Sequence, residues 1–298
     1  MKLFIKLILA SFFLITLGCD KEIEESVMKS DLKKDVEMVT DMGTIIIRLS
    51  DETPLHRNNF IKLVNEKYYD SIAFHRIIEN FVIQAGNPTT KPNKIYSSGG
   101  DPELNYTIEA EIKPNLFHKR GALVAARSGG ISNPDILSSG LQFYIVQRGT
   151  YNDSTLNIQE ERVNKQLAYN KVINSSKIRA EIDNYIKISE EISQNISKED
   201  SLKFEAITKK IELFKVDSLA DIEFKNMNKY KYPEDHREIY KTIGGTPHLD
   251  QNYTVFGEVV KGMNVVDSIA KIEVSKNGKP IKDLYIKSAR MITRKSYQ

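Results

Sequence analysis

The chain has 298 residues, of which 40% are hydrophobic and 28% charged, so it can bury a sizeable core. Its formal net charge is only +3, and Lys2 and Lys6 lie within the first six residues. This near balance of charge excludes a protein that binds nucleic acid through an overall basic surface, and we expect no nucleic-acid partner.

The N-terminal segment predicts an export signal. Residues 1–18 have a short basic start and an apolar run from Leu7 to Leu17, which is too short for a comfortable membrane span. The chain's one cysteine, Cys19, follows directly, and this segment resembles the lipobox of bacterial lipoproteins, in which the cysteine is lipidated. Thr16 stands where that family usually has leucine, so a plain secretory signal remains the alternative. The resemblance implies a lipid-anchored membrane lipoprotein of the cell envelope, on the periplasmic side or the outer surface.

The next segments predict a tether, a hairpin and a helix. Residues 19–35 are highly charged and lack an apolar period, which favours a flexible tether. From residue 36 apolar and polar residues alternate around a turn at Met42-Gly43, as in a β-hairpin. Thr53-Pro54 then begins a helix that we expect over residues 54–65.

The stretch FHRIIENFVIQAGNP, residues 74–88, predicts two short strands joined by a turn at Glu79-Asn80. It places Arg76 among apolar residues, which is costly unless the charge has a use. Taken alone, the pattern favours a structural arginine paired with a carboxylate. A strand over residues 107–112, TIEAEI, and the apolar block of residues 119–147 follow.

Residues 152–242 predict a helical insert in an otherwise β-rich chain. The stretch from Asn152 to Lys241 contains no glycine and one proline, and its isoleucines recur at helical spacing, so we expect two or three helices. Strand-like sequence resumes at residue 243 and ends near residues 283–292. Two roles for the insert stay open: a solvated decoration, or an arm beside the functional site that binds a client or a protein partner.

Five blocks of the chain resemble the cyclophilin family in order and wording: MGTIIIRL, FHRIIENFVIQAGNP, RGALVAAR, SSGLQFYIV and HLDQNYTVFGEVVKGMNVVD. The resemblance implies a mainly β fold, a closed eight-stranded antiparallel barrel with two capping helices, divided by the α-helical insert into residues 36–151 and 243–298. It also implies peptidyl-prolyl cis/trans isomerase activity on proline-containing unfolded or exported polypeptides, with no cofactor.

The resemblance also implies roles for single residues. Arg76 matches the catalytic arginine, and Gln84 matches the glutamine that orients it and contacts the substrate backbone. His248 stands where the eukaryotic type has the tryptophan that contacts cyclosporin, so weak cyclosporin binding is expected. Leu141 replaces a usual serine or alanine, and could face the core or narrow the groove. The positions that match the substrate-binding site are Phe81, Val82, Ala126, Arg127, Gln142, Tyr144, His248, Leu249 and Tyr253.

An arginine suits this chemistry because a guanidinium stays charged and presents several donors in a fixed fork. It can bind the twisted amide, whose nitrogen has regained its lone pair, more strongly than either planar state. The alternative function is a catalytically weak proline-peptide binding module or chaperone of the envelope. The five histidines show no spacing typical of metal ligands, and we expect no metal site.

Overall fold

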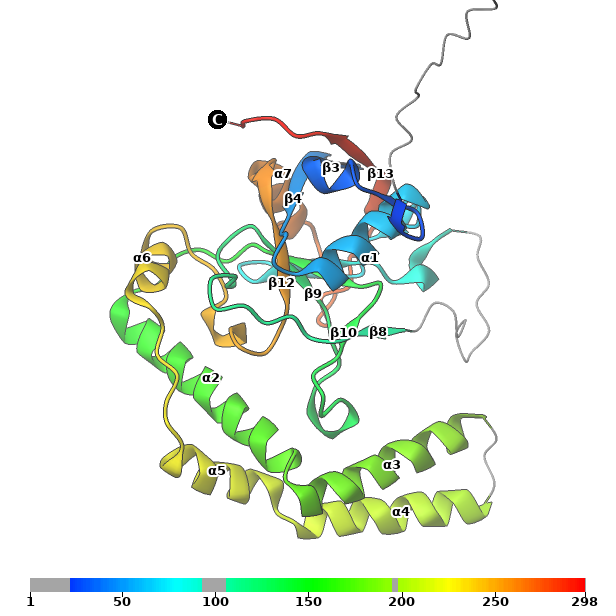
Figure 1. Cartoon of the computed structure of the whole chain (residues 1–298), viewed down its shortest axis with the longest axis vertical. Helices are drawn as coiled ribbons and strands as arrows, with labels where there is room; N and C mark the ends of the chain where they lie inside the picture. Colours follow the sequence, from blue (N-terminus) through cyan, green and yellow to red (C-terminus); the bar gives the residue numbers. More distant parts are fainter. Residues whose placement is uncertain (1–21, 93–105, 195–197, 298) are drawn as a thin grey trace, which may run out of the picture.

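The computed structural model describes residues 22–92, 106–194 and 198–297; the expected signal peptide and Cys19 lie outside these ranges. Nine strands form one curled antiparallel sheet in the order β5-β13-β3-β4-β12-β9-β11-β7-β6 (Figure 1). Along the chain, these strands are β3 (Lys34–Thr40), β4 (Gly43–Leu49), β5 (Ile72–Ala73), β6 (Arg76–Ile78), β7 (Val82–Ala85), β9 (Ala122–Ala125), β11 (Phe143–Val146), β12 (Val255–Lys261) and β13 (Tyr285–Thr293).

The expected closed eight-stranded barrel is not what forms. The sheet has nine strands and is open, since its edge strands β5 and β6 make no ladder with each other. These two strands are consecutive in the chain, and only Phe74 and His75 lie between them. These two residues bond to opposite ends of the sheet: the amide of Phe74 donates to Leu284 just before β13, and that of His75 donates to Gln84 in β7. The chain between β5 and β6 therefore crosses the gap between the two edges and does not close it with a ladder.

Two helices contribute to the core that the curled sheet encloses. Helix α1 (Pro54–Asn65) has the bounds that the sequence predicts, and α7 (Met263–Ala270) follows β12. The ring of Phe60 in α1 lies 5.5 Å from that of Phe143 and 5.4 Å from that of Phe256, measured between centroids. Val266, Ile269 and Ala270 of α7 are buried in the same core. Burial of this apolar surface is the main favourable term in the stability of the sheet.

Part of the expected tether instead packs against helix α1 and the main core. Residues 22–28 form the small hairpin of β1 (Glu22–Glu24) and β2 (Val27–Met28), and Asp31–Lys33 form a short 3-10 helix. Val27 is fully buried in the main core. The sequence did not predict this burial, because Val27 lies in a highly charged segment without an apolar period. The carboxylate of Asp31 accepts from Lys34 at 2.9 Å and from the amide of Met28 at 3.0 Å.

The expected strand over residues 107–112 is shorter than predicted. Only Thr107–Ile108 form a strand, β8, which pairs with β10 (Ser138–Ser139). Glu111 has another task, because its carboxylate accepts the backbone N–H groups of Leu55 and His56 at 3.2 and 3.0 Å. It thereby caps the first turn of α1, where a carboxylate is favourable.

The described residues of the insert form five helices, where the sequence predicted two or three. Helix α2 (Asp153–Ile173) packs beside α5 (Val216–Asn226), and α3 (Ser176–Gln194) packs beside α4 (Lys198–Leu213) (Figure 1). The last helix is α6 (Glu234–Thr242). The break between α4 and α5 lies at Lys215, which adopts a left-handed backbone with φ of 49°. A lysine gives no sequence signal of such a break.

The two ends of the insert meet at the sheet. The amide of Tyr151 donates to the carbonyl of Tyr240 at 3.1 Å, and that of Arg120 to Gly244 at 2.9 Å. Gly245 has a φ of 151°, and a Cβ there would lie 2.2 Å from the carbonyl oxygen of His118, so this junction requires glycine. Within the described ranges, no helix is long and apolar enough to cross a membrane.

Candidate active site

The candidate site lies on the outer face of strands β7, β9, β11 and β12, whose side chains alternate between the two faces of the sheet. In β7 and β11 the residues Ile83 and Ile145 face the main core, whereas their neighbours Val82, Tyr144 and Val146 face the opposite side of the sheet. Successive side chains of a strand point to opposite faces of the sheet. A strand that is apolar throughout therefore places apolar side chains on both faces. The outward residues form a second apolar cluster, over which the site is built.

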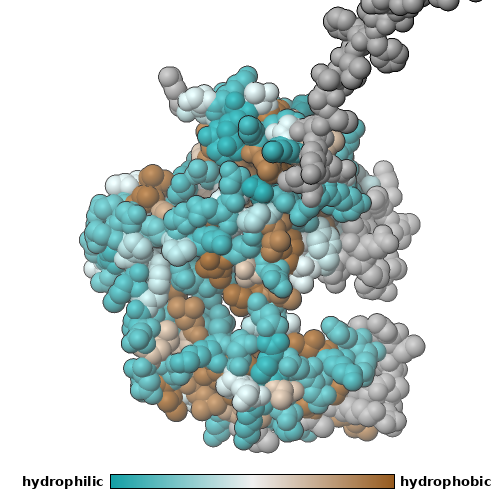
Figure 2. All heavy atoms as spheres, in the orientation of Figure 1, coloured by the Kyte–Doolittle hydropathy of each residue, from teal (hydrophilic) through white to brown (hydrophobic). Residues whose placement is uncertain are grey.

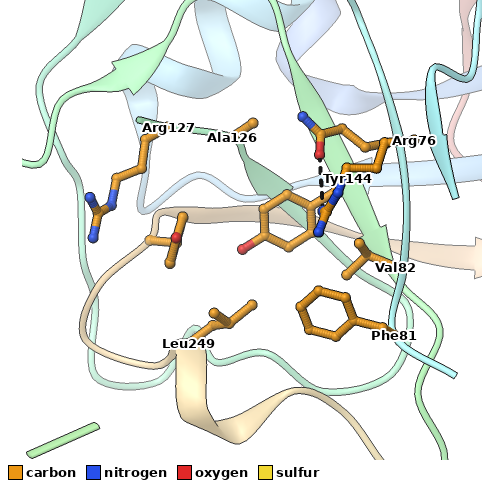
Figure 3. Close-up of a pocket in the computed structure, with 9 residues that line it drawn as sticks. Arg76, Phe81, Val82, Ala126, Arg127, Tyr144 and Leu249 are labelled. Carbon is orange, nitrogen blue, oxygen red and sulfur yellow. Dashed lines mark hydrogen bonds between the residues drawn. The ribbon is translucent and has the colours of Figure 1, made fainter. Parts of the chain in front are cut away.

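A pocket of about 170 Å³ lies on this outer face (Figure 3). Phe81 and Val82 bound one side and Leu249 another, with the ring of Tyr144 among them. Nine of the eleven residues predicted for the site are brought together here: Arg76, Phe81, Val82, Gln84, Ala126, Arg127, Tyr144, Leu249 and Tyr253.

Arg76 projects over the pocket, beside Gln84 (Figure 3). Its Nη1 lies 3.5 Å from Oε1 of Gln84, the upper limit for a hydrogen bond, and its Cζ lies 5.9 Å from the centroid of the Phe81 ring. Gln84 is fixed in turn, since its Nε2 donates to Gln142 at 3.2 Å. Among residues 22–92, 106–194 and 198–297, no carboxylate forms an ion pair with Arg76. This disfavours the interpretation of Arg76 as half of a structural ion pair.

The opposite wall carries a second arginine that is held by backbone oxygens. Arg127 Nε donates to the carbonyl of Asn252 at 2.7 Å, and its Nη1 donates to that of Ser128 at 2.9 Å. Its guanidinium lies 4.5 Å from the centroid of the Tyr253 ring, a cation–π distance. Arg127 therefore fixes Tyr253 at the rim, while Arg76 has weaker restraints.

The remaining predicted residues lie next to the pocket. Gln142 lines a larger groove that begins at Gln84, and His248 lies behind Phe81, with the two rings stacked at 5.7 Å and 17°. Burial lowers the pKa of His248 to about 4, and the nearby positive groups act in the same direction. The imidazole is therefore neutral near pH 7. Leu141 is 4% exposed and packs in the main core, so it does not narrow the groove.

Beneath the pocket lie two buried polar residues to which the sequence analysis gave no role. Nδ1 of His118 and Oδ1 of Asp250 are 2.7 Å apart, and Nε2 of His118 is 3.2 Å from the hydroxyl oxygen of Tyr144. Asp250 directly follows the pocket residue Leu249, which is the one signal that could have drawn attention to it. In the part of the chain that the structure describes, no three His, Cys, Asp or Glu side chains are grouped as metal ligands would be.

Comparison with known proteins identifies the family. A family model described as "Cyclophilin type peptidyl-prolyl cis-trans isomerase/CLD" matches residues 35–200 and 227–291. A candidate peptidyl-prolyl cis-trans isomerase of Staphylococcus aureus strain USA300 is 26% identical over 268 residues, which are 90% of this chain and 95% of that protein. Its counterpart in Staphylococcus epidermidis is 26% identical over 270 residues, 90% of this chain and 94% of that one.

A solved structure also resembles the chain. The crystal structure of a cyclophilin type peptidyl-prolyl cis-trans isomerase from Cryptosporidium parvum has 18% sequence identity and a TM-score of 0.47, and covers 88% of this chain and 99% of its own. The family model and the curated relatives define the class as that of the peptidyl-prolyl isomerases. Within that class of enzymes, the chain belongs to the cyclophilin-type peptidyl-prolyl cis-trans isomerase family.

The buried imidazole of His248 predicts acid sensitivity. Its folded pKa of about 4 lies below the unfolded value of about 6.5, so the unfolded state binds the proton first. Stability from this group is complete above pH 6.5 and is lost as the pH falls towards 4. We expect wild type to lose up to about 3 kcal/mol of unfolding free energy over this range relative to His248→Phe, which keeps the stacked ring. Urea unfolding of both proteins at several pH values measures the difference, and parallel pH profiles would contradict it.

Proposed function

We propose that this chain isomerises X-Pro bonds of exported polypeptides by gripping the proline in the outer pocket and stabilising the twisted amide with Arg76. The observation that carries the proposal is a guanidinium without an ion-pair partner in the described ranges, next to a pocket of about 170 Å³ with an apolar side made by Phe81, Val82 and Leu249. Rotation about an X-Pro bond has a barrier of about 18 to 20 kcal/mol, because the planar amide has partial double-bond character. Lowering it requires neither a nucleophile nor a cofactor.

The roles of the pocket residues follow from the change in the amide. As the bond twists, the proline nitrogen becomes pyramidal and accepts a hydrogen bond, which a donor from Arg76 can supply. Gln84 keeps the guanidinium facing the pocket and presents its own amide to the substrate backbone. Phe81 and Leu249 hold the ring of the proline, so that the rest of the chain rotates against it. The donor gains strength in the transition state, which is the condition for catalysis.

A catalytically weak proline-peptide reader remains the competing function, and Arg76 distinguishes the two. We expect Arg76→Ala to lower kcat/KM for a short Ala-Pro peptide by about 100-fold or more, as for the loss of one transition-state donor. Arg76→Lys should restore little, since a lysine is a point charge without the fork. Isomerisation measured by exchange NMR tests this, with Arg290→Ala as a control because Arg290 pairs with Glu37 on the sheet. Equal rates for wild type and Arg76→Ala would favour the reader.

We also propose that the insert extends the substrate site into a client-binding arm. A groove of about 520 Å³ shares Gln84, Ala126 and Arg127 with the pocket, and continues past Gln142 to Glu190 on α3. A hollow between the sheet and the α3/α4 pair is visible in Figure 2. Arg179 of α3 makes two bonds of 2.7 and 2.8 Å to Asp135 in the loop that forms one wall of the groove. These features favour an arm over a decoration that only packs on the sheet.

Shortening the arm tests this role. Removing residues 186–204 deletes the outer half of the α3/α4 pair and keeps Ile178, Ile182, Ile207 and Ile211, which pack its inner half. We expect kcat/KM for a short Ala-Pro peptide to stay within about twofold, because the peptide fills only the pocket. Catalysed refolding of an unfolded protein limited by proline isomerisation should slow by about threefold or more, since a second contact raises the local concentration of the chain. Equal effects on both substrates would refute the arm.

We infer that the protein acts in the cell envelope as a lipoprotein anchored through Cys19. The support is the sequence alone: a basic start, an apolar run and a cysteine at the expected end of the signal. We expect wild type to incorporate labelled palmitate and to sediment with membranes, and Cys19→Ser to do neither. Absence of palmitate from wild type would favour the plain secretory signal, and palmitate on Cys19→Ser would contradict attachment through Cys19.

A further inference from the structure

A buried path of hydrogen bonds connects the last helix of the insert with the proline pocket. The hydroxyl of Tyr240 in α6 donates to Oδ2 of Asp250 at 2.7 Å, and Oδ1 of Asp250 accepts the backbone N–H of His118 at 2.9 Å. Nδ1 of His118 lies 2.7 Å from the same oxygen, and Nε2 lies 3.2 Å from the hydroxyl oxygen of Tyr144. None of the four residues is more than 5% exposed.

The chemistry of the groups fixes the bonds to Asp250. A carboxylate can only accept, so Nδ1 of His118 carries the proton that points at Asp250. Nε2 of His118 and the hydroxyl of Tyr144 form the remaining hydrogen bond, in which either group can be the donor. Burial leaves no water to replace a lost partner, and an unmade bond in such a network is costly. Each ring therefore has one favoured orientation.

We propose that Tyr240, Asp250 and His118 are positioning residues of the isomerase, through which the helical insert fixes the ring of Tyr144 in the proline pocket. The inference rests on the proposed function, since it assigns these residues to the same site. Tyr144 connects the hydrogen-bond path with the pocket, because its ring lines the pocket and its hydroxyl is the last group of the path. The insert then contributes to the proline site itself as well as to the outer groove.

The anchoring of Tyr240 makes it a suitable start of this path. Its backbone carbonyl accepts the amide of Tyr151, which joins the two ends of the insert, and its ring packs 5.4 Å from that of Phe117 in the loop before β9. These residues share one apolar cluster between the insert and the sheet. Because both the backbone and the ring of Tyr240 are held in place, its hydroxyl can hold the carboxylate of Asp250 in one position.

Removal of one hydroxyl tests the path. In Tyr240→Phe the ring stays and Asp250 loses a donor, so His118 and Tyr144 become free to shift. Because the ring of Tyr144 contacts the proline in planar and twisted states alike, its displacement should raise KM for a short Ala-Pro peptide by about 3- to 10-fold and leave kcat within about twofold. A merely structural role would lower kcat through the folded fraction and leave KM unchanged.

Tyr232→Phe is the matched control. The hydroxyl of Tyr232 is also buried and belongs to the same cluster, but donates to the backbone carbonyl of Pro247 at 2.9 Å. We expect it to lower thermal stability as Tyr240→Phe does, with KM within about twofold of wild type. An equal rise of KM in both variants would overturn the proposal, because the loss would not be specific to the path.

A double-mutant cycle tests the end of the path. In the background of Tyr144→Phe, which has no hydroxyl to hold, Tyr240→Phe should change KM by less than about twofold, since coupled residues are not additive. The same fold-change in both backgrounds would overturn the proposal.

Fluorine labelling tests the path without removing a hydroxyl, and so applies even if the phenylalanine variants do not fold. With 3-fluorotyrosine at position 240, binding of the Ala-Pro peptide should shift the ¹⁹F resonance, while a label at position 232 should not respond. Absence of a shift at position 240 on peptide binding would refute the path. A wild type that binds the peptide without turning it over would instead refute the proposed catalysis, and the label would still report on the coupling.

Discussion

The structure depends on strands that are apolar on both faces. In β7, β9 and β11 alternate residues enter the enclosed core, and the residues between them form a second cluster outside. A sheet with one polar face would offer a peptide no hydrophobic surface, whereas here the apolar residues of the outer face underlie the pocket. Arg76 lies at the edge of this surface, at the start of a strand that pairs on one side only. An edge position lets a charged side chain reach the pocket without being enclosed.

The second constraint is the attachment of the helical insert. Its ends join at Tyr151 and Tyr240, and α2 packs on the short 3-10 helix Pro247–Leu249, of which Leu249 lines the pocket. Asn170 of α2 donates to Asn252 at 2.9 Å, and the carbonyl of Asn252 holds Arg127. The insert thus reaches both walls of the pocket, so sheet and helices together hold the candidate site.

Sequence patterns predicted what local physics determines. The bounds of α1 followed from Pro54 and its apolar spacing, and the Glu79-Asn80 turn lies where the change of apolar runs indicated, with Asn80 at a φ of 57°. What failed depended on distant partners. Val27 finds its core, and Glu111 its helix end, only once the sheet is formed. The open seam and the bonds of Asp250 are likewise properties of the assembled fold, which no periodicity along the chain records.

The junction of the insert has a consequence for the order of folding. Strand β9 must pair with β12, which begins about 130 residues later, and closing so long a loop is entropically costly. The hydrogen bonds within each helix between them are local and form quickly. Once Tyr151 and Tyr240 are joined, the loop left to close is about 40 residues, which lowers its entropic cost by about 1 kcal/mol. An insert that makes up about a third of the chain therefore need not slow the pairing of the strands on either side of it.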